Sequence, residues 1–273
     1  MVEPMIRVAR IRLIGLWAGG MAQGVLAAGA VQAGETRCWI DNGAVVVAAA
    51  YGPILGDFIL DLSQAHSQLH ATAAQATGWT GDSARRTLRL AGETVPAFPI
   101  AIADLDARTR GFPTNIAGVL GADVLGRFAL DLDLEPCRLR LTRGPASRRP
   151  GAHRLRIRMI AGAPAVFAAI SDGVTSRTGW FAIDTASAGS RIADAGFSRP
   201  PARSVDPSGR AWAPARLRAV SVGGTLIEQT PAGLMKPAEP GLAGALGVAV
   251  WSRFHVRMDG RRGWMEVRAG RRP

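Results

Sequence analysis

Residue types that build redox and metal sites are scarce in this sequence. Its 273 residues include two cysteines and four histidines, and the cysteines do not form a Cys-x-x-Cys pair. Nothing in the cysteine spacing therefore indicates a redox centre or a zinc site. His66 and His70 are four residues apart, but no third ligand and no His-Glu-x-x-His motif accompanies them. We expect the two histidines on an exposed helix face, and we expect no metal and no cofactor.

Lysine and tyrosine are nearly absent. Lys236 is the lone lysine and Tyr51 the sole tyrosine, so the net charge of +12 comes from arginine. Arginines alternate with apolar residues at 138–140 and 154–159, as they do on the solvent-facing side of a strand. Aromatic residues are not interleaved with the arginines, so no surface for base stacking is visible. We expect no nucleic-acid binding, and a basic surface better suited to anionic components of a cell envelope.

The first 33 residues have the organisation of a secretory signal peptide. Three arginines between Arg7 and Arg12 precede the apolar run LIGLWAGGMAQGVLAAGAVQA, and small residues precede a polar junction at Gly34. Cleavage after Ala33 would give an exported protein, periplasmic or secreted, without stable membrane insertion. The run is long enough to cross a bilayer, so an uncleaved anchor is the alternative.

The two cysteines, Cys38 and Cys137, lie in the first half of the exported chain. In an oxidising compartment an isolated pair usually forms a disulfide, and we expect one here. Two separate free thiols are the alternative.

Strand patterns dominate the rest of the chain. Four segments of the first half have apolar or alternating strand patterns with turn residues between them: 44–50, 54–61, 85–103 and 128–134. The second half has the same order of patterns at 164–170, 179–184 and 215–229. The best helical pattern is short and covers 68–79. The sequence therefore predicts a mostly β protein with small helices.

Two pairs of segments are similar to each other across the two halves. FILDLSQAHSQL (58–69) and FAIDTASAGSRI (181–192) share four of twelve positions: Phe58/Phe181, Asp61/Asp184, Ala65/Ala188 and Ser67/Ser190. AGVLGADVLGRFALDLD (117–133) and AGALGVAVWSRFHVRMD (243–259) share eight of seventeen. Repetition at this period predicts two equivalent lobes. We expect them at 34–143 and 154–273, joined by a Pro/Arg/Gly-rich linker at 144–153.

These landmarks, in this order, resemble the pepsin and retropepsin superfamily of aspartic proteases. In that family each lobe gives one Asp, and an apolar-apolar-Gly segment packs beside it. The corresponding residues here are Asp61 with Val119-Leu120-Gly121 and Asp184 with Ala245-Leu246-Gly247. The sequence is most similar to bacterial envelope proteins that contain two retropepsin-like units. The resemblance implies a bilobal β fold, a monomer, and a peptide or unfolded protein as substrate.

The resemblance also implies a reaction. Asp61 and Asp184 would be the catalytic residues of an endopeptidase, facing each other across a pseudo-twofold axis. Two carboxylates in contact cannot both ionise easily, so they share one proton. One carboxylate then activates a water molecule, and the protonated partner polarises the peptide carbonyl.

The loops that follow the two Asp residues depart from the family pattern of Asp-Thr/Ser-Gly. Asp184 is followed by Thr185 and Ala186, whereas Asp61 is followed by Leu62 and Ser63. Leu62 has no hydroxyl to bond across the lobe interface, and a Cβ at 63 or 186 crowds a loop that normally contains glycine. The alternative function is therefore a catalytically retired scaffold that binds a peptide or a protein partner in its cleft.

Two further expectations concern the surroundings of the cleft. The hairpins near 82–98 and 208–228 occupy the chain positions of flaps, although neither contains a tyrosine. The tryptophans Trp180, Trp251 and Trp264 are expected in the core.

Overall fold

The structure, a computed structural model, is mostly β, as the sequence predicts. It describes residues 33–144, 148–199, 204–205, 211–212, 215–235 and 239–270, all of which belong to one compact unit. Residues 1–32 of the expected signal peptide lie outside the described residues. No helix in the described ranges is long and apolar enough to cross a membrane.

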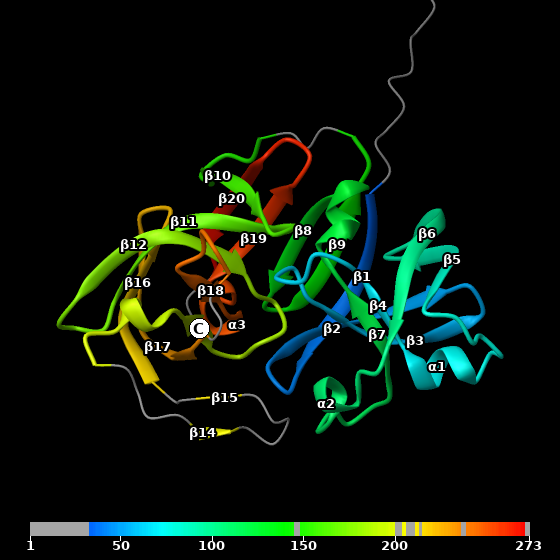
Figure 1. The fold of residues 1–273 in the computed structure, drawn as a ribbon. Helices are drawn as coiled ribbons and strands as arrows, with labels where there is room; N and C mark the ends of the chain where they lie inside the picture. The colour runs from blue at the N-terminus through cyan, green and yellow to red at the C-terminus, as the bar shows by residue number, and fades with distance from the viewer. Residues whose placement is uncertain are drawn as a thin grey trace, which may run out of the picture. The chain divides into compact units, whose positions relative to one another are not determined.

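The first half of the chain folds mainly into strands, most of which lie on the right-hand side of the view in Figure 1. Its elements are β1 (Ala33–Asp41), β2 (Ala44–Tyr51), β3 (Ile54–Leu60), β4 (Gln68–His70), α1 (Ala71–Gln75), β5 (Ser83–Leu90), β6 (Glu93–Ala103), α2 (Asp106–Thr109), β7 (Ile116–Leu120), the 3-10 helix Ala122–Gly126, β8 (Ala129–Leu134) and β9 (Cys137–Thr142). Two of the pairings are parallel: β3 pairs with β7, and β4 pairs with β6.

The second half has the same pairings around Asp184. Its elements are β10 (His153–Ile160), β11 (Ala163–Ser171), β12 (Ser176–Ile183), β13 (Ser190–Ile192), the 3-10 helix Asp194–Gly196, β14 (Ser204–Val205), β15 (Ala211–Trp212), β16 (Ala215–Val222), β17 (Thr225–Leu234), β18 (Gly244–Leu246), α3 (Val248–Trp251), β19 (Phe254–Asp259) and β20 (Trp264–Ala269). Here β12 pairs in parallel with β18, and β13 with β17. The two halves are thus two lobes of one design.

A sheet shared by both halves joins them. Its strands pair in the order β1, β9, β8, β19, β20, β10 (Figure 1). Within this sheet, the two halves meet at the antiparallel pair β8–β19. Alternating charges cross this sheet on neighbouring strands: Glu35, Arg140, Asp131, Arg257, Glu266 and Arg154. Three arginines, Arg140, Arg257 and Arg154, are therefore matched by carboxylates on adjacent strands, which favours the sheet.

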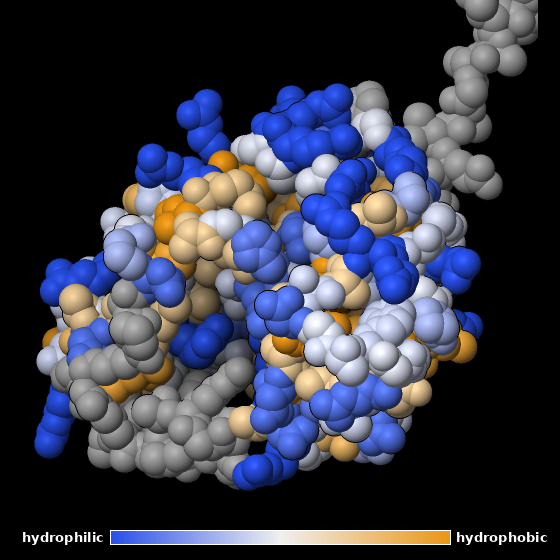
Figure 2. All heavy atoms as spheres, turned by 45° about the vertical axis from the view of Figure 1, so that its right-hand side comes forward, coloured by the Kyte–Doolittle hydropathy of each residue, from blue (hydrophilic) through white to orange (hydrophobic). Residues whose placement is uncertain are grey.

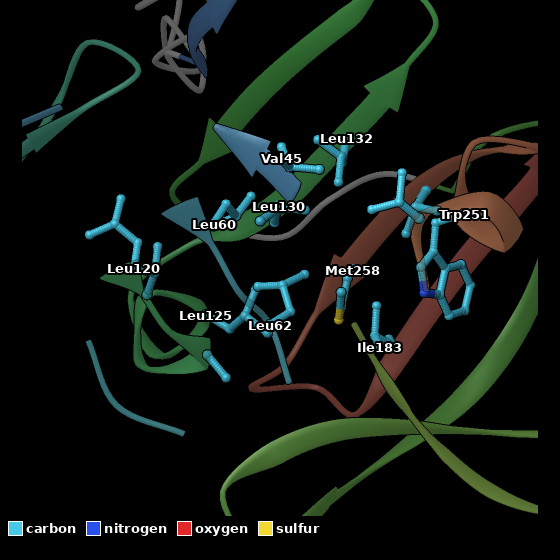
Figure 3. Packing of buried hydrophobic residues seen from close by; sticks show 14 of the residues in the cluster. Val45, Leu60, Leu62, Leu120, Leu125, Leu130, Leu132, Ile183, Trp251 and Met258 are labelled. Carbon is cyan, nitrogen blue, oxygen red and sulfur yellow. The ribbon is translucent and has the colours of Figure 1, made fainter. Parts of the chain in front are cut away.

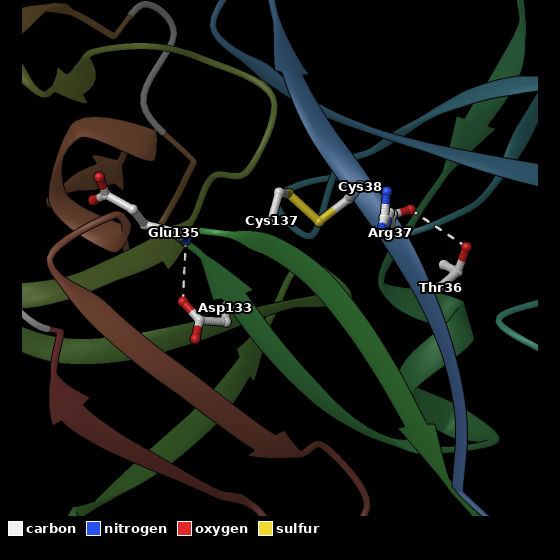
Figure 4. Close-up of a disulfide and its surroundings, with 6 residues drawn as sticks. All are labelled: Thr36, Arg37, Cys38, Asp133, Glu135 and Cys137. Atoms are coloured by element: carbon white, nitrogen blue, oxygen red, sulfur yellow. Dashed lines mark hydrogen bonds between the residues drawn. A yellow bond between two sulfur atoms is a disulfide. The ribbon is translucent and has the colours of Figure 1, made fainter.

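The cysteines form the expected disulfide. Cys38 in β1 and Cys137 at the start of β9 are joined, with a sequence separation of 99 (Figure 4). Cys137 follows the turn at Glu135-Pro136, where the peptide bond is cis. The bridge links β1 to β9, its neighbour in the shared sheet.

The apolar core runs through both halves. Leu60 and Leu62 of the first half belong to the same buried cluster as Ile183, Trp251 and Met258 of the second (Figure 3). Burial of such side chains is the main favourable term in folding. Leu62, which lacks the hydroxyl found at this position in the family, is therefore a core residue that packs between the halves.

Two expectations about individual side chains are wrong. His70 is buried and caps helix α1, accepting a hydrogen bond from the Thr72 N–H at its Nδ1, while exposed His66 precedes β4. The two histidines therefore share no helix face, because the segment expected as helix at 68–79 begins with a strand. Trp251 and Trp264 are buried, but Trp180 is only partly buried.

Candidate functional site

The two Asp residues occupy equivalent places at the ends of strands β3 and β12. The Asp61 N–H donates to the Leu120 carbonyl and the Asp184 N–H to the Leu246 carbonyl, each at 2.9 Å. These bonds fix each loop to the parallel strand beside it. Asp61 is 5% exposed and Asp184 is not exposed.

The serines that are identical in the two loops also have equivalent roles. The hydroxyl of Ser67 accepts a hydrogen bond from the Gly121 N–H at 2.9 Å, and Ser190 accepts from Gly247 at 3.2 Å. Both glycines are needed for close approach. A Cβ on Gly121 would lie 2.7 Å from the backbone of His66, and one on Gly247 would lie 2.3 Å from the backbone of the loop after Asp184. The apolar-apolar-Gly segments thus pack directly against the Asp loops.

The identical alanines mark contacts between the halves. A Cβ added to Gly162, in the β10–β11 turn, would lie 2.6 Å from the Cβ of Ala65. A Cβ added to Gly43, in the β1–β2 turn, would lie 2.5 Å from that of Ala188. Each half therefore places a tight turn against the Asp loop of the other. At positions 65 and 188, a residue larger than alanine would collide with the tight turn of the other half.

Thr185 joins the two Asp loops directly. Its hydroxyl accepts a hydrogen bond from the Leu62 N–H at 3.1 Å and donates to the Leu60 carbonyl at 2.6 Å. The carbonyl of Thr185 also accepts from the Val45 N–H at 2.8 Å. The reciprocal side-chain bonds cannot form, because position 62 is leucine. The loops are thus held together from one side only.

The Asp61 carboxylate is bound by residues of its own half. Its Oδ1 accepts hydrogen bonds from the N–H of Ser63 at 2.9 Å and from the Ser63 hydroxyl at 2.6 Å. Its Oδ2 pairs with the guanidinium of Arg108, which lies in α2 and also bonds Gln64. The side chains of both partners are mostly buried, at 17% and 7% exposed.

The Asp184 carboxylate has a similar environment. Its Oδ1 accepts from the Ala186 N–H at 2.9 Å, and its Oδ2 accepts from Nε and Nη2 of Arg191 at 3.1 and 2.8 Å. Burial opposes the charge of Arg191, but the charges of Asp184 and of Asp61 more than offset this, so the pKa of Arg191 is raised. Both carboxylates therefore stabilise the charged form of Arg191.

These ion pairs bear on the chemistry expected at the site. Sharing a proton requires one carboxyl to be neutral, whereas a guanidinium partner stabilises the charged form of each. The outer oxygens, Oδ2 of Asp61 and Oδ2 of Asp184, are engaged by arginine. The arrangement differs from the proton-sharing pair that the family resemblance implies.

A cleft of about 820 Å³ contains the site. It is lined by residues of both halves, among them Asp61, Arg108, Ala186 and Arg191. This volume is within the range of ligand-binding pockets.

Among the residues that the structure describes, none in the hairpins expected as flaps, 82–98 and 208–228, lines the cleft. The tip of β5–β6, at Ala91-Gly92, packs on β1, where a Cβ on Gly34 would lie 1.8 Å from the Ala91 carbonyl oxygen. The tip of β16–β17, at Gly223, packs near Val267 of β20. In the second half a short antiparallel pair, β14–β15, precedes that hairpin, and residues 206–210 between its strands lie outside the described residues.

Sequence reasoning missed the two arginines. Arg191 follows Asp184 by seven residues in the same repeated segment, so its position was visible, although arginine there is not part of the family pattern. Arg108 is 47 residues from Asp61 and arrives from a separate helix. No local spacing could have indicated that contact.

Comparisons with known proteins give the fold. Solved structures similar to this chain include an aspartic proteinase from Irpex lacteus, with a TM-score of 0.56 and 13% identity over 88% of this chain and 98% of that one. The chain has the pepsin-like fold. A second neighbour, Basic 7S globulin from soybean, has a TM-score of 0.56 and 12% identity over 88% of this chain and 95% of that one. No protein-family model and no curated protein sequence matches the chain.

Proposed function

We propose that this protein binds an extended peptide segment in the cleft of its pepsin-like fold and does not hydrolyse it. The observation that carries the proposal is that each site carboxylate is paired with an arginine, Asp61 with Arg108 and Asp184 with Arg191. In this state an arginine engages the Oδ2 atom of each carboxylate, so these oxygens are not free to hold a catalytic water. The cleft itself remains, and its polar groups can bond to peptide amides.

The second candidate is the aspartic endopeptidase that the family resemblance implies. It is favoured by the Thr185 hydrogen bonds, which hold the two loops together, and by the N–H groups of Ser63 and Ala186 on the carboxylates. This function requires the arginines to leave the carboxylates when substrate binds.

Unfolded, fluorescein-labelled casein separates the two functions. We expect its fluorescence anisotropy to rise with protein concentration, and we expect no cleavage on gels between pH 3 and 7. The Asp184→Asn variant is the control for contaminating protease, because any cleavage that survives it does not come from this site. Cleavage that is lost in this variant would contradict the binding proposal and support the endopeptidase.

Repair of the Asp loops tests the second candidate further. Leu62→Thr, Ser63→Gly and Ala186→Gly together would rebuild the family pattern. Because Arg108 and Arg191 remain, we expect the triple variant to stay inactive on casein. Asp184-dependent cleavage by the repaired protein would show instead that loop geometry alone limits hydrolysis, since a misplacement of about 1 Å can cost ~10²-fold in rate.

We further propose that the chain works after export, in the periplasm or outside the cell, as a monomer built from two retropepsin-like units. The Cys38–Cys137 disulfide supports export, because such bonds persist in oxidising compartments. Intact-mass measurement of protein extracted from a bacterial envelope should give a chain that begins at or near Gly34. A mass that includes the first 33 residues would contradict cleavage and favour a retained anchor.

A further inference from the structure

The two walls of the cleft differ in polarity. The second half contributes mainly apolar side chains, including Ile160, Leu234, Met235 and Leu242. The first half contributes mainly polar and charged ones, including Asn42, Ser63, Gln64, Arg108 and Arg110. Asp61 lines the cleft between these walls, and so does Arg191, the partner of the buried Asp184. A ligand that fills the cleft must therefore meet apolar surface on one side and polar surface on the other.

The second half is also less bulky at positions that are equivalent by strand register. In the first half, three neighbouring residues of β2, β3 and β7 are branched: Val46, Ile59 and Val119. The equivalent three of β11, β12 and β18 are all alanines: Ala165, Ala182 and Ala245. Ala182 and Ala245 line the cleft. Leu242, which lines the cleft, packs against these three buried alanines and forms the apolar side together with them.

Apolar surface continues from this wall along the outside of β11 and β12. Phe167 and Trp180 are paired across the two strands, with ring centroids 5.6 Å apart, and Phe167 is 52% exposed. The equivalent pair in the first half is Ala48–Asp57. Figure 2 shows hydrophobic surface gathered on this side of the molecule. Exposed aromatic residues next to a cleft are typical of an interaction site.

An extended peptide has a matching alternation. Its successive side chains point to opposite sides, so odd positions would face one wall and even positions the other. We propose, on the basis of the peptide-binding function above, that the ligand is an amphipathic β-strand segment of an unfolded polypeptide. Its apolar side chains face Met235 and Leu242, and its polar side chains face the wall that carries Gln64 and Arg110.

Two fluorescein-labelled peptides of the same length and composition test this inference. Both are built from valine, phenylalanine and serine; one alternates apolar and polar residues, and the other has its apolar residues in one block. We expect the alternating peptide to bind about 10-fold more tightly or better, since each apolar contact in a pocket is worth roughly that factor.

A matched pair of variants locates the effect. Met235→Glu places a charge on the apolar wall, and Met159→Glu makes the same change on β10 at a residue that is 49% exposed and does not line the cleft. We expect the first to weaken binding of the alternating peptide about 10-fold and the second to leave it unchanged. Circular dichroism and thermal melts show that both variants are folded.

The outcomes separate this inference from the proposed function. Equal affinity for the two peptides, or equal effects of the two variants, would overturn the amphipathic-strand inference and leave peptide binding in place. Binding of casein without binding of either peptide would also overturn the inference alone. Failure of casein and of both peptides to bind would overturn the proposed function as well.

Discussion

Replacement of Arg191 by methionine should lower the free energy of unfolding by about 3 kcal/mol at pH 7, because it leaves the buried Asp184 carboxylate without a counter-ion. Asp184 is not exposed, and Arg191 supplies two of the three hydrogen bonds found for its carboxylate. The methionine side chain keeps most of the apolar stem of arginine, so the loss is mainly electrostatic. Urea unfolding followed by circular dichroism measures it.

A second substitution identifies the cause. Arg191→Met combined with Asp184→Asn should recover most of the lost stability, since no buried charge is then left unpaired. Equal losses in the single and double variants would show that Arg191 acts through packing instead.

Removal of the disulfide should have a similarly large effect. For the sequence separation of 99 between Cys38 and Cys137, the chain-entropy model assigns the bridge about 4 kcal/mol. For a chain of this size, that corresponds to roughly 10 °C in Tm. The double variant Cys38→Ala/Cys137→Ala should show this loss in a thermal melt. Addition of a reductant should then have no further effect on the variant, whereas it should lower the Tm of the wild-type protein.

A small change would contradict this account of the bridge. If reduction shifts the wild-type Tm by only a degree or two, one of two explanations applies. Either the β1–β9 pairing persists in the unfolded chain and already restricts it, or this pairing alone keeps the reduced protein folded. Free-thiol titration of the native protein is the accompanying measurement. The described structure predicts no reactive thiol before reduction.

The positions that could be predicted from sequence are those whose roles repeat in both halves. Phe58 and Phe181 are both fully buried, and Asp61 and Asp184 both follow a strand beside an apolar-apolar-Gly segment. Identity at these places reflects the same steric and hydrogen-bonding demand met twice. This repetition and the strand patterns predict two similar β lobes, the family resemblance implies the pepsin-like fold, and the structure confirms that fold.

The features that sequence did not reveal depend on contacts between distant segments. Arg108 reaches Asp61 from α2, and the β5–β6 hairpin turns toward β1 instead of the cleft. Trp180 has the apolar context of a core residue, but it is only partly buried, beside Phe167 and under the guanidinium of Arg158. Each outcome depends on which elements cover a given face, and this cannot be predicted from local sequence patterns.

The ion pairs also explain why a degenerate loop can be stable. Loss of a hydroxyl at Leu62 removes one set of bonds between the loops, yet the leucine gains burial in the core shared by the halves. Each carboxylate is then neutralised by an arginine of its own half. A binding cleft can keep its shape in this way without a working pair of acids.

The most direct test of this account uses a peptide that contains statine and a matched peptide in which the statine hydroxyl is replaced by hydrogen. A hydroxyl placed between two carboxylates that share a proton imitates the transition state, and such mimics bind at least ~10²-fold more tightly than their counterparts. Because Asp61 and Asp184 are each paired with arginine, we predict that both peptides bind with dissociation constants within a few-fold of each other. Binding of the statine peptide about 100-fold or more tightly would contradict this account and show that the two carboxylates work as an aspartic-protease pair.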